Sequence, residues 1–383
     1  MAVDRVLPSQ DAHDLVELTR ELADKELRPK AAEYEDRHEF PRELFRTLGR
    51  SGLLGLPYPE EYGGGGQPYE VYLHVLEELA HAWLAVALGV SVHGLACHAT
   101  AMFGAEEQKA RFLPDLLGGA LLGAYCLSEP ESGSDAASLR TRAERAADGS
   151  AYTLTGTKAW VSHAGVADFY TVMARTGEGG AKGVSTFLVP ADSPGVRPQQ
   201  PERKMGLYAS PTGQVVLEGV QVPADRRIGA EGEGFTIAMS ALDGGRLGIA
   251  ACAVGVAQAA LDHAVDYARE RRQFGHPIIE FQGVGFLLAD MATQVAAARA
   301  LYLEAARLRD AGLPYSDRAA MAKLFCTDTA MRVTTDAVQV LGGAGYVEDH
   351  PVERYFREAK VLEIVEGTNQ VQRLVISRTL QRL

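Results

Sequence analysis

A single carboxylate near the C-terminus has the setting of a catalytic base. Glu366 lies within the segment 364–370 (IVEGTNQ), where a glycine turn leads into an amphipathic helix. A carboxylate held there can be sheltered from water and directed at one C–H bond, which suits it to remove a proton from carbon. The alternative for an isolated loop glutamate is that it stays solvated and complements the positive end of the helix dipole. Other parts of the chain must decide between these two roles.

Four common catalytic and nucleotide-binding motifs are absent from the sequence. It contains no complete GxGxxG, GxxxxGK[ST], HExxH or GxSxG. Nicotinamide, P-loop, zincin and hydrolase functions therefore have no sequence support. The cysteines form no CxxC pair and have no histidine at metal-ligand spacing, so we predict no metal site and expect buried thiols in a reducing compartment. These cysteines are Cys97, Cys126, Cys252 and Cys326.

Length and charge narrow the possible partners. A chain of 383 residues is long enough for two or three domains, or for one large subunit that buries a sizeable ligand. Lys and Arg number 38 against 50 Asp and Glu, which gives a net charge of −12. This excess of acid argues against a surface that binds a nucleic-acid backbone. Any nucleotide is expected to be bound by local contacts.

The N-terminal sequence and the apolar runs predict a cytoplasmic protein. Residues 11–21 alternate acidic and basic side chains and lack the basic start and apolar core of a signal peptide. We expect no apolar run to approach the ~20 residues that cross a bilayer. We therefore predict neither a membrane association nor a nucleic-acid partner.

Periodicity divides the chain into three parts. Residues 1–123 have helical spacing of Leu, Val and Ala, interrupted by a Pro- and Gly-rich loop at 57–66. Residues 124–230 contain short β-branched and aromatic runs separated by Gly, Pro and Asp, which predicts a small β domain. Residues 231–383 return to long helical patterns with short connections, typical of an antiparallel bundle.

Further motifs accompany the Glu366 segment in a fixed order. They are YCLSEPESGSD at 125–135, AWVS at 159–162, RRQFG at 271–275 and QVLGGAGY at 339–346. This ordered set resembles the acyl-CoA dehydrogenase family, and the resemblance extends from segment 59–64 to segment 372–378. The glycines at 342–345 alone would pass as an ordinary helix C-cap.

The resemblance implies a fold, a cofactor and partners. The expected fold is α+β and mostly α, with a helical N-terminal domain, a middle β-barrel or sandwich domain and a C-terminal four-helix bundle. The expected cofactor is FAD, the substrate an acyl-CoA, the acceptor an electron-transfer flavoprotein and the assembly a homotetramer. The implied pathway is catabolism of fatty acids or branched-chain amino acids.

The resemblance also implies how Glu366 acts. It would remove the α-proton of the acyl thioester, while flavin takes the β-hydrogen as hydride at N5. The backbone N–H of Glu366 would help to polarise the thioester carbonyl, where enolate charge develops. A subset of the family carries its base at the position of Gly245, so the glycine there favours Glu366.

Binding residues follow from matched motif positions. Arg271 matches an arginine that pairs with the FAD pyrophosphate, for which a planar guanidinium is suited; taken alone, it would pass as a solvated helix-end charge. The segment 339–343 matches one that contacts the adenine end of FAD in a neighbouring subunit. The complete set implied for the cofactor is Tyr125, Leu127, Ser128, Ser134, Trp160, Ser162, Arg271, Gln273, Phe274, Gln282, Gln339, Gly342, Gly343, Thr368 and Gln370.

A second set is implied for the CoA thioester. Its members are Ser134, Asp243, Arg246, Gly367 and Arg378. Glu131 replaces a glycine common in the family and Tyr208 replaces a frequent arginine, so the CoA entrance departs from the usual pattern. Several stretches are most similar to short-chain and branched short-chain members.

Two alternatives differ from acyl-CoA dehydrogenation. One is the same flavin chemistry on a biosynthetic thioester, bound to CoA or to a carrier, or an oxidase that passes electrons to oxygen. The other is a flavin-bearing binding protein without catalysis. The acidic net charge and the intact Glu366 weigh against the second.

Overall fold

Helices make up the N-terminal part of the chain. The computed structural model describes residue 3 and residues 5–381. The helices are α1 (Gln10–Leu22), α2 (Ala31–Arg37), α3 (Arg42–Arg50), α4 (Tyr69–Ala82), α5 (Leu84–Phe103) and α6 (Glu106–Leu117). Helices α4 and α5 are separate because Trp83 between them has extended backbone angles (φ −160°, ψ 106°). Both helices are buried on nearly every side, which explains their Leu-, Val- and Ala-rich sequence.

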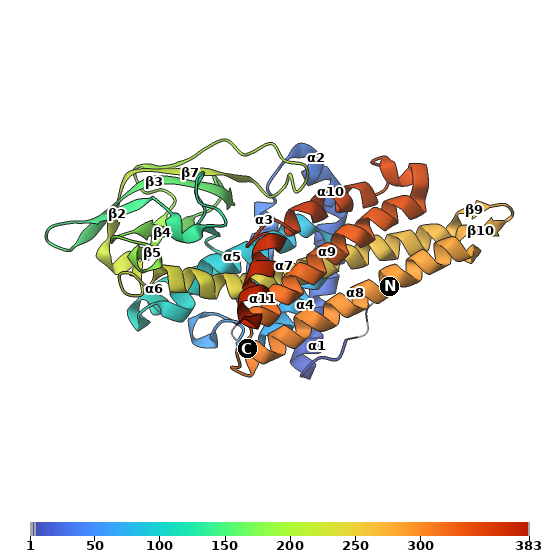
Figure 1. Ribbon diagram of the computed structural model, residues 1–383, viewed down its shortest axis with the longest axis horizontal. Helices are drawn as coiled ribbons and strands as arrows, with labels where there is room; N and C mark the ends of the chain where they lie inside the picture. The colour runs from blue at the N-terminus through green and yellow to red at the C-terminus, as the bar shows by residue number, and fades with distance from the viewer. Residues whose placement is uncertain (1–2, 4, 382–383) are drawn as a thin grey trace.

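The middle of the chain forms one sheet, drawn in green in Figure 1. Its strands are β1 (Gly123–Cys126), β2 (Arg142–Arg145), β3 (Ala151–Ser162), β4 (Phe169–Arg175), β5 (Val184–Pro190), β6 (Val196–Pro198), β7 (Thr212–Pro223) and β8 (Arg227–Ile228). Their order is β6-β7-β3-β2-β4-β5-β8, and β1 pairs with β4 in parallel. The long β3–β7 pair has two register shifts, one of them between Lys158 and Val161. That bulge re-aims the end of β3.

Long helices return after the sheet. They are α7 (Gly234–Glu270), α8 (Gln282–Asp310), α9 (Ser316–Leu341), α10 (Val352–Leu362) and α11 (Asn369–Leu380). A small hairpin of β9 (Arg272–Gln273) and β10 (His276–Pro277) joins α7 to α8 at the far end of the bundle (Figure 1). The order of helices, sheet and helices confirms the predicted mostly α, α+β fold. The sequence predicts long helices in this part of the chain and does not predict the short helix α10.

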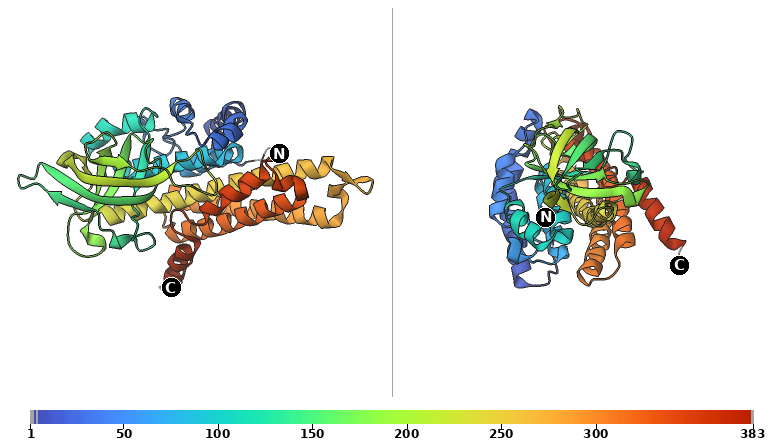
Figure 2. Two further views of the ribbon diagram at one scale, coloured as in Figure 1. Left: turned by 90° about the horizontal axis from the view of Figure 1, so that it is seen from above. Right: turned by 90° about the vertical axis from the view of Figure 1, so that its left-hand side faces the viewer.

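Helix α7 is the axis of the molecule. It packs against α4, α5, α8, α9 and α10, and its first residue, Gly234, lies against the backbone of Ser185 in β5. A 37-residue helix is about 55 Å long. Figure 2 shows it running from the sheet toward the hairpin end, so it connects the two ends of the subunit.

The sequence predicts no apolar run long enough to cross a bilayer, and this expectation was wrong. Three helices are long and apolar enough to cross a membrane: Leu84–Phe103, Gly234–Glu270 and Gln282–Asp310. In the first two, 94% of the apolar window is buried inside the protein, so this length serves the core. In the third only 22% is buried. The expectation that the four cysteines are buried thiols is confirmed, since all four are buried and free.

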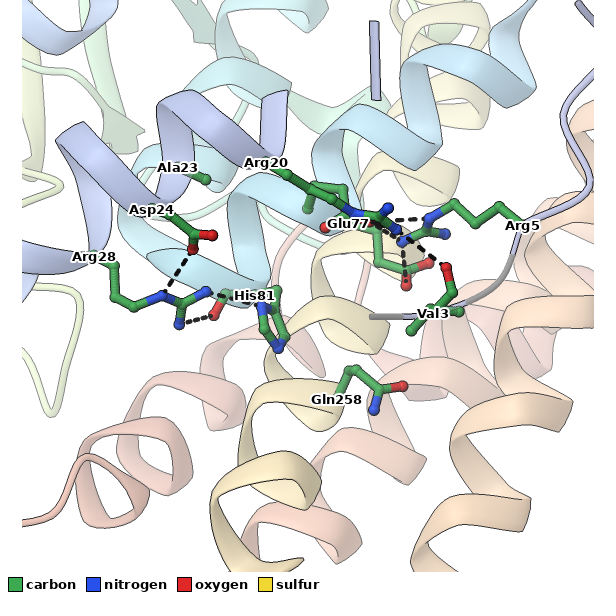
Figure 3. A pocket seen from close by; sticks show the side chains of 10 residues that line it. Val3, Arg5, Arg20, Ala23, Asp24, Arg28, Glu77, His81 and Gln258 are labelled. Carbon is green, nitrogen blue, oxygen red and sulfur yellow. Dashed lines mark hydrogen bonds and ion pairs between the residues drawn. The ribbon is translucent and has the colours of Figure 1, made fainter. Parts of the chain in front are cut away.

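A cluster of paired charges fastens the N-terminal segment to the bundle. Glu77 of α4 accepts hydrogen bonds from Arg5 (2.9 Å), Arg299 of α8 (3.0 and 3.2 Å) and the Tyr302 hydroxyl. Burial opposes ionisation of this carboxyl, but the two arginines outweigh it and hold the pKa of Glu77 well below its ordinary value. Beside the cluster is a cavity of about 220 Å³, shown in Figure 3. Its charged side chains pair with one another, which indicates a structural role.

Removing Glu77 is expected to destabilise the fold. In Glu77→Ala the guanidinium groups of Arg5 and Arg299 lose their shared carboxylate, and breaking a buried ion pair from one side costs about 3–5 kcal/mol. We expect a clearly lower urea midpoint, measured by circular dichroism. Glu21→Ala is the control, because Glu21 pairs only with exposed Lys25 and should leave the midpoint nearly unchanged. Equal midpoints for the two variants would show that the cluster adds little.

Candidate active site

Glu366 lies in a tight turn between α10 and α11. Its backbone is left-handed (φ 53°), and so is that of Gly367 (φ 93°). Thr368 caps α11 by accepting a hydrogen bond from the N–H of Val371 (3.3 Å). A left-handed backbone is costly for a residue with a side chain, and such strain persists only where the surroundings impose it. The turn therefore directs the Glu366 side chain inward at a cost in conformational energy.

The carboxylate of Glu366 is cut off from water. Both of its oxygens are buried and neither has a hydrogen-bond partner among the described residues, although other atoms of the residue are partly exposed. Burial raises the pKa of Glu366 to about 8, and Lys323 and Arg246 oppose that rise. A carboxylate with a pKa near the working pH is a much better general base than a solvated one.

Lys323 of α9 holds the turn in place. Its ammonium donates to the carbonyl of Gly367 (3.0 Å) and to Oδ1 of Asn369 (2.9 Å). Gln372 donates to the same Gly367 carbonyl (2.8 Å). Burial lowers the pKa of Lys323 to about 7, opposed by Glu366. Sequence reasoning missed this residue, and the available signal was a lysine on the apolar face of the helix containing Leu324.

The carboxylate faces a point on α7 where no side chain projects. A Cβ atom added to Gly245 would lie 2.0 Å from Oε2 of Glu366 and 3.1 Å from Cδ1 of Leu95. Gly245, Gly244 and Leu95 also line a small cavity between α4, α5 and α7. The Glu366 carboxylate therefore lies beside Gly245 at the edge of this small cavity.

Two strand ends that carry residues predicted for the cofactor lie side by side. The segment after β1 carries Leu127 and Ser128, and the carbonyl of Ser128 accepts a hydrogen bond from the N–H of Ala159 in β3 (2.9 Å). Trp160 occupies the β3 bulge with φ 59° and is 66% exposed, and Ser162 ends the strand. Tyr125 of β1 is within electrostatic reach of Glu366. The Trp160 ring and two serine hydroxyls thus lie at neighbouring strand ends, and β1, which leads to one of them, carries the tyrosine that is close enough to Glu366 for its charge to be felt.

The residues predicted for the CoA thioester are less closely grouped. Asp243 and Arg246 lie on either side of Gly245 in the sequence of α7. They form an ion pair with 2.6 Å between Arg246 Nη1 and Asp243 Oδ1. Gly367 is in the Glu366 turn, and next to it Thr368 and Gln370, which were predicted for the cofactor, lie at the start of α11. Ser134 is exposed in the loop after β1, and Arg378 is exposed near the end of α11, which projects from the body in Figure 2. Within this chain Ser134 and Arg378 do not contact the Glu366 turn.

The remaining predicted cofactor residues gather at the opposite end of the bundle. A cavity of about 400 Å³ there is lined by Arg271, Gln273, Gly342 and Gly343 among others. Gln282 begins α8 beside it, Gln339 lies in the last turn of α9, and Phe274 of the hairpin is 92% exposed. A Cβ atom at Gly342 or Gly343 would meet nothing within 4 Å. A guanidinium beside an open glycine backbone suits a phosphate-bearing cofactor such as FAD.

One chain does not bring these two groups together. Gly245, which touches Glu366, and Arg271 are separated by 26 positions of the sequence, nearly all of them in α7. That separation corresponds to about 39 Å along the helix, farther than one dinucleotide cofactor reaches. Tyr208, a departure from the family pattern, is distinct from both groups and stacks on His38 (4.2 Å between ring centroids).

Comparison with known proteins covers nearly the whole chain. Models described as the N-terminal, middle and C-terminal domains of acyl-CoA dehydrogenase match residues 9–120, 124–220 and 232–381. An acyl-CoA dehydrogenase of Bacillus subtilis (strain 168) is 46% identical over 365 residues, which cover 95% of this chain and 96% of that protein.

Two solved structures are also similar. Butyryl-CoA dehydrogenase from Megasphaera elsdenii superposes with a TM-score of 0.96 at 41% identity, covering 99% of this chain and 100% of the other. A chain from a study of the electron transferring flavoprotein of Acidaminococcus fermentans and flavin-based electron bifurcation has a TM-score of 0.96 at 43% identity, with full coverage of both chains. With its three domains matched in order and its fold shared, this chain is an oxidoreductase that belongs to the acyl-CoA dehydrogenase family.

Proposed function

We propose that the protein catalyses FAD-dependent α,β-dehydrogenation of a short acyl-CoA to the trans-2-enoyl-CoA, with Glu366 as the base. The observation that carries this proposal is the buried carboxylate of Glu366, which has no partner and faces the cavity at Gly245. A short acyl group is supported by the likeness to a butyryl-CoA dehydrogenase.

The chain's own residues supply the proton transfer and the positioning. The α-proton goes to the Glu366 carboxylate, whose ionisation is made costly by burial and whose position is set by Lys323. The backbone N–H of Glu366 donates to no described acceptor and is free to polarise the thioester carbonyl. Bound FAD supplies the acceptor that takes the β-hydrogen with its electron pair.

We also propose that the cofactor site is shared between subunits of a homotetramer. The region of Trp160, Ser162 and Glu366 and the region of Arg271 are too far apart in one chain to hold one FAD, so the partner's Arg271 region would complete each site. Large apolar side chains exposed near the distal region support such contact. They are Phe274 (92% exposed), Phe286 (66%), Tyr346 (86%) and Val347 (47%).

An electron-transfer flavoprotein is the proposed acceptor. The supporting observation is the full-length similarity to a chain from a structural study of such a flavoprotein. FAD, when bound, would supply the site from which reducing equivalents leave before the next turnover, and a second flavoprotein could accept them.

Replacing the base tests the proposed chemistry. The purified protein should be yellow and should be bleached by butyryl-CoA without oxygen. Glu366→Gln should retain FAD and acyl-CoA, while turnover falls about 10²–10⁴-fold because general-base catalysis is lost. The matched control is Glu363→Gln, whose carboxylate pairs with Lys360, and it should remain active. Full activity in Glu366→Gln, or a folded protein that refuses FAD, would refute the proposal.

The pH dependence tests the electrostatics of the base. Because Glu366 must be ionised to accept a proton, kcat/KM should rise with pH and level off above about 8. Lys323 lowers the pKa of Glu366, so Lys323→Met should move this rise to higher pH. Lys360→Met, which removes a lysine paired with Glu363, should leave the profile in place. Superimposable profiles for all three proteins would contradict the assigned role of Lys323.

Subunit mixing tests the shared site. Neither Arg271→Glu nor Glu366→Gln should be active alone. In a co-expressed mixture, a site with Glu366 from the first variant and Arg271 from the second is intact, so activity should reappear. A mixture as inactive as its components, with mixed oligomers shown by mass spectrometry, would mean that each chain builds its own site.

A further inference from the structure

The cavity next to Glu366 is unusually polar for the end of an acyl pocket. It is enclosed by α4, α5, α7, the end of α8 and the loop at Pro57 and Tyr58. Among its lining residues are three tyrosines, Tyr58, Tyr69 and Tyr72, and one arginine, Arg309. The free volume is only about 20 Å³, comparable to one water molecule. A long aliphatic tail has no room there.

Arg309 brings a cation to this cavity without a counter-charge. Its guanidinium carbon is stacked 3.4 Å from the ring centroid of Tyr69. Its Nη1 is buried and has no hydrogen-bond partner, and no carboxylate in the described part of the chain pairs with it. Two neighbours on α8 differ, since Arg307 pairs with Glu70 and Arg299 pairs with Glu77. The residue as a whole is partly exposed, but a buried N–H donor without a partner is costly, so Nη1 points to a ligand group that accepts a hydrogen bond.

The tyrosines leave one further donor free. The hydroxyls of Tyr58 and Tyr69 donate to the backbone carbonyls of Gly94 (2.6 Å) and Gly244 (2.9 Å). The Tyr72 hydroxyl makes no hydrogen bond within the described residues and would lie 3.0 Å from a Cβ atom at Gly94. No lining residue of the cavity is acidic. The Arg309 guanidinium can only donate and the Tyr72 hydroxyl is able to donate, so together they suit an acceptor-rich, negatively charged ligand group.

Two adjacent glycines on α7, Gly244 and Gly245, show how far Arg309 lies from the candidate base Glu366. A Cβ at Gly245 would meet Oε2 of Glu366 at 2.0 Å, and a Cβ at Gly244 would meet Nη1 of Arg309 at 3.2 Å. Adjacent Cα atoms are 3.8 Å apart, so the carboxylate and the guanidinium lie within roughly 12 Å of each other. Burial lowers the pKa of the nearby His98 to about 3, which leaves Arg309 as the positive charge of the cavity.

We propose that Arg309, assisted by Tyr72, binds a carboxylate at the distal end of a short acyl group, so that the preferred substrate is the CoA monothioester of a short dicarboxylic acid. This inference rests on the proposed dehydrogenase function and names its substrate class. The proton-accepting carboxylate of Glu366 acts at the thioester end, and Arg309 neutralises the charge at the other end. A hydrogen-bonding site of this kind rejects an apolar tail because the tail would leave the buried donors unpaired.

The test compares two acyl groups of similar shape. Glutaryl-CoA carries a terminal carboxylate, and 5-methylhexanoyl-CoA replaces that carboxylate with an isopropyl group. Binding of each to the FAD-loaded Glu366→Gln protein is measured by calorimetry, which avoids turnover. We expect glutaryl-CoA to bind at least about 10-fold more tightly. Adding Arg309→Met should reduce this preference about 10- to 100-fold, the range for a hydrogen bond to a charged group.

Two further variants serve as controls. Arg307→Met removes a guanidinium from the same helix but one paired with Glu70 outside the cavity, so the preference should persist. Tyr72→Phe deletes only a hydroxyl and should reduce the preference severalfold. If Arg309→Met does not fold, the preference of the parent protein and the effect of Tyr72→Phe decide the question.

The outcomes separate this inference from the function on which it rests. A parent protein that binds the apolar analogue as tightly as glutaryl-CoA, or a preference unchanged in Arg309→Met, overturns the role of Arg309. In either case bleaching of the wild-type protein by butyryl-CoA would leave the dehydrogenase function standing. A wild-type protein that no acyl-CoA bleaches would instead overturn the function itself.

Discussion

The structure depends on keeping one carboxylate dry. Glu366 carries two buried, unpartnered oxygens on a left-handed backbone, and both features oppose folding. They persist because the turn is held from outside, by Lys323 and Gln372 at the Gly367 carbonyl and by Asn369, whose amide donates to Asp328 (2.7 Å). These hydrogen bonds go to Gly367 and Asn369, so the carboxylate of Glu366 has no hydrogen-bond partner among the described residues. Gly367 and Asn369 thus position the turn, while Glu366 keeps the reactive group.

The same constraint explains the glycine on α7. The space that a side chain at position 245 would occupy is filled by the Glu366 carboxylate, with only 2.0 Å between Oε2 and an added Cβ. A base at either position would point into the same volume, so the two placements exclude one another sterically. The glycine, which the sequence suggests only by comparison, is therefore a direct packing requirement of the glutamate. Helix α7 therefore connects Gly245, which faces Glu366, to the Arg271 region at its C-terminal end.

The sequence pattern predicted those features of the fold and the site that depend on residues close together in the chain. The change from helical to strand spacing and back marks the three parts of the fold, and the glycine turn before α11 marks Glu366. Lys323 and Arg309 escaped prediction, because their roles depend on residues far apart in sequence. The division between the Trp160 and Arg271 regions was anticipated only in part, through the resemblance of segment 339–343 to one that contacts FAD in a neighbouring subunit. A lysine or arginine on a long helix is usually solvated, and only the packed structure shows which one is buried. The apolar lengths of α5 and α7 were likewise underestimated, because small residues such as glycine and alanine interrupt them without exposing them.

The charges at the two ends of the acyl cavity constrain each other. A substrate carboxylate placed near Glu366 without its own cation would favour the protonated base and suppress proton abstraction. Arg309 removes that penalty by neutralising the distal carboxylate where it binds. In the absence of such a ligand, the same guanidinium has only tyrosine neighbours among the described residues, with the rings of Tyr69 and Tyr315 at 3.4 and 5.9 Å, and such contacts are weaker than a buried ion pair. A neutral acyl tail would leave the positive charge of Arg309 unpaired, whereas the distal carboxylate of a dicarboxylic thioester would pair with it. The protonation state of Glu366 and the preferred acyl group therefore depend on the same pair of charges.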